Sequence, residues 1–230
     1  MKRSDINRYL AEAVVFIGMM NFKFPPFAYW TPEEWLGKGP EFDEIRENML
    51  GWDITDFGSG SYTEVGLLLF TLRNGSSKKQ SGSKPYAEKI MVVREGQVTP
   101  LHFHSNKMED IINRGGGNLL VDVYNATIDH QIADSEVTIR VDGHARVVKA
   151  GSVIRLRPGE SIALPTHQYH RFRAEQGFGM VLAGEVSQVN DDTTDNYFYK
   201  PAGRFPNVIA DEAPRYLLCH EYPPAAGLLC

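Results

Sequence analysis

The chain has 230 residues and a formal net charge of −5, with 42% hydrophobic and 23% charged residues, as in an ordinary globular protein. The acidic balance argues against nucleic acid or an anionic membrane as a partner, because both require a basic face. Two cysteines are too few for a secreted disulfide scaffold, and no apolar run is long enough to span a bilayer. We therefore expect a cytoplasmic protein with a single domain over 1–230.

The first 60 residues predict a helix followed by an aromatic arm. Residues 1–20 carry apolar side chains at helical spacing and predict an amphipathic helix that Ser4 caps. Residues 21–60 are rich in aromatic residues, proline and glycine, with a short helix expected around 31–35. We predict that this arm packs on the outside of the core.

Short runs of β-forming residues separated by turn residues dominate the rest of the chain. Strands are predicted over 64–71, 89–93, 99–104, 118–124, 136–141, 145–149, 152–156, 161–164, 169–174 and 180–186. Residues 74–85 are rich in Gly and Ser and predict a surface loop or an active-site lid. Many short strands without long helices between them indicate an antiparallel sandwich or barrel. We predict a β-barrel core over 87–187 and a proline-rich wrapping tail over 188–230.

His102 and His104 form one half of a predicted metal site. Side chains two apart on a strand share a face, so both imidazoles are expected to point the same way. The residues that follow can turn the chain, which lets Glu109 return on the next strand as an oxygen ligand. Borderline transition metals accept mixed nitrogen and oxygen ligands of this kind.

A further ligand is expected from residues 165–172, which offer two histidines. His170 shares the inward face of the apolar Phe172, whereas His167 lies in the preceding turn and cannot share that face on a regular strand. We therefore choose His170. The predicted ligands of one divalent transition metal are His102, His104, Glu109 and His170.

The chain resembles the cupins in the spacing of two motifs. The first motif is matched by Gly96, His102, His104, Glu109 and Gly116, and the second by Gly151, Pro158-Gly159, Pro165 and His170. The second match is looser, since Pro158 and Gly159 are adjacent. This resemblance implies a mainly β cupin fold, a small antiparallel barrel or jelly roll, here with an N-terminal helix and extended arms. It implies a bound metal but is nearly silent on the reaction.

Longer strings resemble the D-lyxose ketol-isomerase family and extend over about half the chain. They lie at 85–90, 101–104, 107–118, 184–187, 189–192 and 203–206. The resemblance implies a manganese-dependent homodimer that acts on free sugars. It implies interconversion of D-lyxose and D-xylulose, and of D-mannose and D-fructose, through a metal-stabilised enediol.

Moving a sugar carbonyl from C1 to C2 requires a base that removes a proton beside the carbonyl and returns it to the neighbouring carbon. Glu109 is one candidate, and Glu185 at the end of a predicted strand is another; a surface carboxylate is the alternative interpretation of Glu185. Lys107 either stabilises the enediolate or moves a proton between its oxygens, unless it is only a solvated turn lysine. The predicted catalytic residues are Lys107, Glu109 and Glu185.

Three further residues are predicted to hold sugar hydroxyls. Lys89 lies on a strand expected beside the site, and Asp192 and Arg204 suit hydroxyls because charged groups make strong hydrogen bonds with them. A turn rich in Asn and Asp is the alternative interpretation of the region around Asp192.

Other functions are compatible with the same metal ligands. Cupin dioxygenases bind iron through such residues, and a phosphosugar isomerase would share the metal shell. A non-catalytic sugar-sensing cupin and a metal-free structural cupin are further alternatives. A dioxygenase would stop without oxygen, a sensor would bind sugar without proton exchange, and metal analysis would reveal a metal-free protein.

Overall fold

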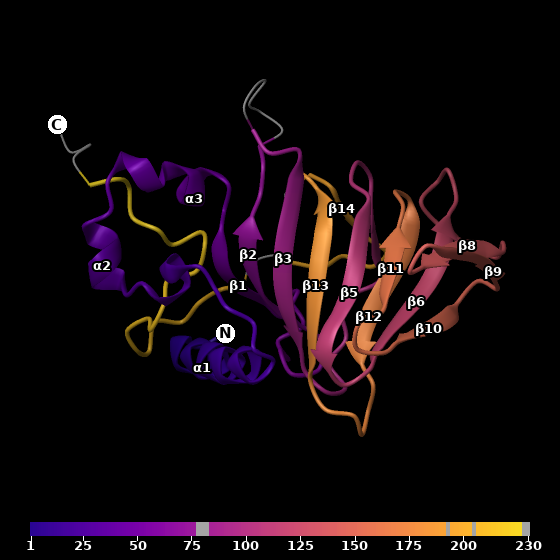
Figure 1. The fold of residues 1–230 in the computed structure, drawn as a ribbon, viewed down its shortest axis with the longest axis horizontal. Coiled ribbons are helices and arrows are strands. Elements are labelled where there is room, and N and C mark those ends of the chain that lie inside the picture. Colours follow the sequence, from indigo (N-terminus) through magenta and orange to yellow (C-terminus); the bar gives the residue numbers. More distant parts are fainter. Residues whose placement is uncertain (77–82, 192–193, 204–205, 227–230) are drawn as a thin grey trace.

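Figure 1 shows short helices at one end of the molecule, beside two curled antiparallel β-sheets. The computed structural model describes residues 1–76, 83–191, 194–203 and 206–226. The helical elements are α1 (Arg3–Met19), η1 (Pro26–Tyr29), α2 (Pro32–Leu36), η2 (Pro40–Phe42) and α3 (Asp43–Glu47). The predicted N-terminal helix and the short helix near residue 31 are therefore confirmed.

Within the described residues, eight strands form the larger sheet in the order β1-β2-β3-β13-β5-β11-β8-β9. Their bounds are β1 (Gly51–Thr55), β2 (Leu67–Arg73), β3 (Tyr86–Val93), β5 (Glu109–Gly116), β8 (Val137–Val141), β9 (His144–Val148), β11 (Ser161–Leu164) and β13 (Val181–Gln188). Neighbouring strands are antiparallel throughout.

The smaller sheet has the order β10-β6-β12-β4-β14 in the described part of the chain, with β7 pairing on β6. Its strands are β4 (His102–His104), β6 (Leu119–Ala126), β7 (Ile132–Ala133), β10 (Ser152–Leu156), β12 (Gln168–Ala174) and β14 (Asn196–Phe198). The mainly β, antiparallel architecture predicted from the sequence is confirmed.

Two apolar cores lie on opposite faces of the larger sheet. On β3, Met91 and Val93 belong to the inner core between the sheets, and Ile90 and Val92 belong to the outer core beneath α1. Successive side chains on a strand point to opposite faces, so a strand buried on both faces reads as a continuous apolar run. Each large apolar side chain buried in this way contributes roughly 1.5–3 kcal/mol. The site faces the inner side of this doubly covered sheet.

The prediction that Ser4 caps the first helix is wrong. The first helix begins at Arg3 after the N-cap Lys2, so Ser4 lies inside it and does not cap it. The Ser4 hydroxyl and amide instead contact Asp211 of the C-terminal segment, at 2.8 and 3.0 Å. Thr31 does cap α2, in a reciprocal pair of hydrogen bonds with Glu34.

The predicted arm and tail both contribute strands to the sheets. Residues 51–55 of the arm form β1, whose five residues are all buried, and residues 196–198 of the tail form β14 beside β4. The predicted lid over 74–85 lies partly outside the described residues, at 77–82. No helix among the described residues is both long and apolar enough to cross a membrane.

Candidate active site

Three imidazoles from two neighbouring strands of the smaller sheet, β4 and β12, converge on one face of that sheet. His170 on β12 is the direct register partner of His102 on β4, and His104 follows two residues later on the same face. The ring centroids of His102 and His170 are 4.3 Å apart, and one ring nitrogen from each of the three histidines lies within 4.8 Å of the others. Strand alternation and antiparallel pairing thus place the three side chains together.

An oxygen atom lies beside the Nδ1 atom of each imidazole. Nδ1 of His102 is 2.9 Å from the carbonyl oxygen of Pro100, and Nδ1 of His170 is 3.0 Å from that of Gln168. Nδ1 of His104 is 3.5 Å from Oδ2 of Asp195, without a hydrogen bond of normal geometry between them. The two carbonyl oxygens favour the tautomer of His102 and His170 with the proton on Nδ1, which leaves Nε2 as the coordinating atom.

The carboxylate of Glu109 on β5 completes this group. Oε1 of Glu109 lies 3.0 Å from Nε2 of His170, and Oε2 lies 3.2 Å from Nε2 of His104. Nε2 of His170 is nevertheless buried without a hydrogen bond of normal geometry to any described residue. A buried imidazole nitrogen that faces a carboxylate and two further imidazoles is well suited to a divalent transition metal.

Burial and neighbouring charges set the protonation of these side chains. Burial lowers the pKa of His102 well below its usual value, and His170 and His104 lower it further. Burial alone would raise the pKa of Glu109, but the Lys107 ammonium and the His104 and His170 imidazoles hold it well below its usual value. Neutral imidazoles beside an ionised carboxylate are the protonation states that a metal requires.

A buried pair of lysines and a second carboxylate adjoin the histidines. Nζ of Lys107 lies 3.0 Å from Oε2 of Glu109 and 2.7 Å from Oε1 of Glu185 on β13. Nζ of Lys89 on β3 lies 3.2 Å from the same Glu185 oxygen. Both ammonium groups also donate to Oδ1 of Asn190, at 2.8 and 3.0 Å. Lys107 therefore contacts three acceptor residues and Lys89 two, and neither lysine extends into solvent.

The buried charges of this network cancel. Two ammonium groups face two carboxylates, and burial of Glu185, which would raise its pKa, is outweighed by Lys107 and Lys89, which lower it. Even with the buried Asp195 carboxylate beside His104, a divalent cation would give the site a net positive charge. Such a charge stabilises an anion that forms in a water-poor pocket.

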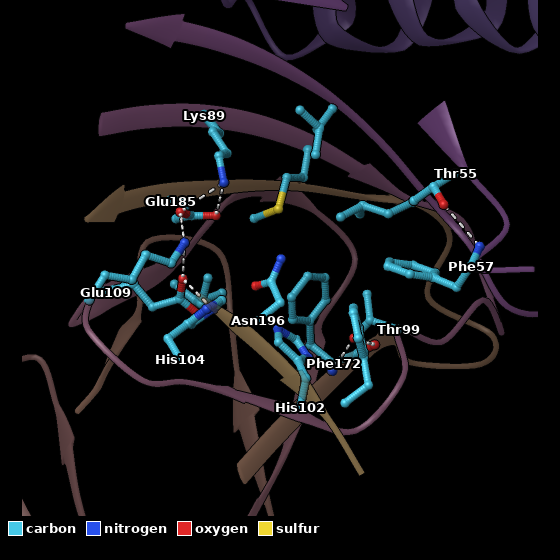
Figure 2. Close-up of a pocket in the computed structure, with 16 residues that line it drawn as sticks. Thr55, Phe57, Lys89, Thr99, His102, His104, Glu109, Phe172, Glu185 and Asn196 are labelled. Atoms are coloured by element: carbon cyan, nitrogen blue, oxygen red, sulfur yellow. Dashed lines mark hydrogen bonds and ion pairs between the residues drawn. The ribbon is translucent and has the colours of Figure 1, made fainter. Parts of the chain in front are cut away.

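A pocket of about 530 Å³, part of it open to solvent, lies against this network. Figure 2 shows Lys89, Glu185, Glu109 and His104 on one side of it and Phe57 on the other. Its remaining wall is mostly apolar. Apolar lining residues include Leu67, Leu69, Met91, Ile111, Phe172 and Phe198. The pocket therefore has a charged half and an apolar half.

Comparison with known proteins identifies the family. The family model described as D-lyxose isomerase matches residues 1–222. The chain belongs to the D-lyxose isomerase family. This membership confirms the predicted class of enzyme, an aldose–ketose isomerase.

Two proteins called D-lyxose/D-mannose isomerase are similar to this family member over nearly their full length. That of Escherichia coli O157:H7 is 50% identical over 223 residues, and that of Serratia proteamaculans is 49% identical over 224. Each alignment covers 96% of this chain and 98% of the relative.

Solved structures of L-ribose isomerases share the fold of this D-lyxose isomerase family member. The enzyme of Cellulomonas parahominis with L-psicose has a TM-score of 0.58 at 16% identity, over 91% of this chain and 98% of that one. The Acinetobacter sp. DL28 enzyme with L-ribose has a TM-score of 0.59 at 14% identity, over 90% and 98%. At this identity the likeness supports the fold alone, and with it the predicted cupin architecture.

The structure brings together most of the residues singled out in the isomerase sequence. His102, His104, Glu109 and His170 meet in one cluster, and Lys89, Lys107 and Glu185 adjoin it. Asp192 and Arg204 lie outside the described residues. His167 stands in the turn before β12, at φ 59°, and stacks on Phe103 away from the cluster.

Several residues of the isomerase site were missed in the sequence. Asn196 and Phe198 on β14 line the pocket. Asp195 lies beside His104, and Asn190 accepts hydrogen bonds from the two lysines. The alternating Asn-Tyr-Phe-Tyr string at 196–199 was a weak strand signal. The partners of Asp195 and Asn190 lie many residues earlier in the chain, and no local pattern connects them.

Proposed function

We propose that the chain interconverts free D-lyxose and D-xylulose, and, as a second pair, D-mannose and D-fructose, in a metal-dependent reaction. Relatives about 50% identical that are called D-lyxose/D-mannose isomerase support this substrate class. The observation that carries the proposal is the juxtaposition of the histidine cluster with an ionised Glu185 and two lysines, at the charged half of one pocket.

Four side chains would hold the metal: His102, His104, Glu109 and His170. The nitrogen and carboxylate donors suit several divalent ions, and the family resemblance supports Mn²⁺. A divalent ion held here supplies Lewis acidity, which polarises the sugar carbonyl and offsets the negative charge of the enediolate.

Glu185 is the proposed base. Its carboxylate lines the pocket and is ionised, because Lys107 and Lys89 lower its pKa, so it can take the proton from C2 and return it to C1. Glu109 is less available, since it is a proposed metal ligand and its two oxygens lie 3.0–3.2 Å from His104, Lys107 or His170. Oε2 of Glu185 has a longer contact, 3.4 Å to Nζ of Lys89. This geometry favours Glu185 between the two carboxylates.

Lys107 is proposed to move the second proton of the reaction. Its Nζ atom lies between the two carboxylates, 3.0 Å from Glu109 and 2.7 Å from Glu185. An ammonium in this position can donate a proton to O1 and then, as the neutral amine, take the proton from O2, which restores the ammonium. Lys89, which also lines the pocket, is proposed to hold a sugar hydroxyl, and Asp192 and Arg204 remain predicted hydroxyl ligands.

The remaining predictions become proposals of the same kind. We propose a cytoplasmic homodimer whose ligand is a free sugar, with neither nucleic acid nor a membrane as a partner. The net charge of −5 and the family resemblance support them. Light scattering of the purified protein tests the dimer, and activity on D-lyxose but not on its phosphate tests the free-sugar specificity.

One experiment tests the proposed reaction directly. The Mn²⁺-loaded protein is incubated with D-lyxose in deuterated water under argon, and both D-xylulose and deuterium uptake at the exchanged carbon are measured. We expect product and label together, and the loss of both after treatment with a chelator. Binding of lyxose with neither signal would favour a sensor, and a requirement for oxygen would favour a dioxygenase.

A further inference from the structure

A second group of metal-binding side chains lies at the β1 edge of the larger sheet. One atom each from the Asp53 carboxylate, the Cys219 thiol and the His220 imidazole lies within 4.8 Å of the other two. In the described part of the chain, the other group that meets this criterion is the histidine cluster of the active site. The edge group shares no residue with that cluster and combines three different donors.

Backbone pairing brings these residues together. Leu218 forms a parallel bridge with Trp52, and the Cys219 amide donates to the Trp52 carbonyl oxygen at 2.7 Å. Leu218 and Trp52 both belong to the outer core. Because side chains alternate along paired strands, Asp53 and Cys219 both face away from that core and lie side by side. A turn at 219–220 then places His220 beside them.

The surroundings of this group are closely packed. Asp53 is 2% exposed and Cys219 is 6% exposed, whereas His220 is exposed. The Tyr222 hydroxyl donates to the Leu50 carbonyl oxygen at 2.9 Å.

The packing of Tyr222 against the β1 edge depends on a glycine. Gly51 has a φ of +111°, and a Cβ atom at this position would lie 1.9 Å from the hydroxyl oxygen of Tyr222. The tyrosine can therefore close over the β1 edge only because residue 51 has no side chain. Asp53, two residues later on the same face, is also buried.

We propose that Asp53, Cys219 and His220 bind a thiophilic divalent cation, with Zn²⁺ as the best match, at a site separate from the active site. Carboxylate, thiolate and imidazole are all ordinary zinc donors, and a tetrahedral ion separates such donor atoms by roughly 3.3–3.6 Å. Donor atoms at most 4.8 Å apart reach that spacing by small side-chain rotations. Because His220 is exposed, water can take the fourth position.

The site would fasten the C-terminal segment to the edge of the sheet. In Figure 1 this segment, drawn in yellow, runs past the helices on the β1 side of the molecule. Thr55, two residues beyond Asp53 on the same strand face, lines the active-site pocket. An ion here would stabilise the native state by mass action and hold the strand that forms part of the pocket wall.

Cobalt provides the decisive test, because a thiolate ligand gives Co²⁺ a near-ultraviolet charge-transfer band and the active site contains no cysteine ligand. The metal-free, reduced full-length protein is titrated with Co²⁺. We expect two equivalents to bind, one of them with the sulfur-to-cobalt band. Zn²⁺ should remove the band, and a thermal scan with Zn²⁺ in place of Co²⁺ should show a higher Tm.

Three variants show which residues give rise to the sulfur-to-cobalt band. Cys219→Ser should abolish the band, while the active-site equivalent of Co²⁺ and the isomerase activity remain. His220→Asn, at an exposed position, should weaken binding of the other equivalent, at the β1 edge, at least tenfold. His170→Asn should remove the active-site equivalent and keep the band. Absence of the band in the wild-type protein, its survival in Cys219→Ser, or its loss in His170→Asn would each overturn the proposal. If Cys219→Ser does not fold, the wild-type spectrum and His220→Asn decide.

Discussion

The two halves of the pocket differ in how the chain builds them. The charged half consists of side chains on central strands and of Lys107 in the connection between β4 and β5, and each ammonium and carboxylate is buried beside a partner of opposite charge. The apolar half includes Phe57, just after the edge strand β1, and Phe198 on the edge strand β14, whose rings lie 5.8 Å apart. The central strands fix the reactive groups and part of the apolar wall, and the edges add the two rings of Phe57 and Phe198.

The two halves of the pocket meet different functional requirements. Proton transfer and metal binding require geometry fixed to within a fraction of an ångström, which packed central strands provide. An apolar wall requires only shape and size, so it tolerates construction from edges. We therefore expect changes in the charged half to abolish turnover or metal binding, and changes in the apolar half to weaken binding of the sugar.

The largest effect is expected for His170→Asn. This substitution removes a ligand from the buried cluster, so bound metal should fall to a small fraction of one equivalent at the site. Turnover of D-lyxose should fall by on the order of 10³-fold or more, because Lewis-acid stabilisation of the enediolate is lost. Metal analysis and initial rates measure both effects.

His144→Asn is the matched control for this prediction. His144 begins β9 and is exposed, so this variant should keep both metal and activity. A His170→Asn protein that retained its metal and turned over lyxose normally would place the catalytic ion elsewhere.

Glu185→Gln is expected to have the next largest effect. Glutamine keeps the shape of the side chain but cannot accept the C2 proton, so kcat should fall by about 10²–10⁴-fold. Bound metal should remain near the wild-type amount, because Glu185 is not among the proposed ligands. Deuterium uptake should fall in parallel with product formation.

Exposed Glu64→Gln should leave kcat unchanged and serves as the matched control. Should Glu185→Gln retain kcat while Glu109→Gln retains metal and loses deuterium uptake, the base would be Glu109.

The sequence could predict those parts of the site that depend on residues close together in the chain. His102 and His104 were found because strand alternation acts over two residues, and Glu109 because the next strand begins directly after them. His170 was chosen over His167 because it shares the face of Phe172, and the register of β12 against β4 agrees with that choice. Each of these inferences uses a rule that acts over a few residues.

Asp195, Asn196 and Phe198 were not predicted because no local rule places them. They lie in a segment interpreted as a wrapping tail, and they reach the site only because β14 pairs with β4, about 90 residues earlier in the chain. Thr55 likewise reaches the pocket through the pairing of β1 with β2. Such pairings are determined by the tertiary structure, which the alternation of a single strand does not reveal.

A moderate effect is expected for Asp195→Asn, which changes the residue behind a ligand. Oδ2 of Asp195 lies 3.5 Å from Nδ1 of His104, and its other oxygen accepts from the Asn106 amide at 2.6 Å. Loss of the negative charge should weaken metal binding by about 10–100-fold, as for other residues behind metal ligands. Metal affinity from competition with a chelator measures it.

The exposed Asp129→Asn is the matched control and should not change metal affinity. Turnover at saturating metal should recover much of its wild-type value in Asp195→Asn, since no ligand is removed. Equal affinity in the two variants would show that Asp195 does not support His104.

The smallest effect is expected for Phe198→Ala in the apolar half of the pocket. The Phe198 ring lies 5.6 Å from the His102 ring and faces the Phe57 ring across 5.8 Å. Its removal takes away apolar surface against which the sugar C–H groups pack, so KM for D-lyxose should rise by roughly tenfold, within the range of small hydrophobic contacts. Because the proton-transfer groups keep their places, kcat should change much less. Phe178→Ala, at an exposed aromatic position, is the control. If Phe198→Ala instead lowered kcat as much as Glu185→Gln with KM unchanged, the division between a reactive half and a binding half would be wrong.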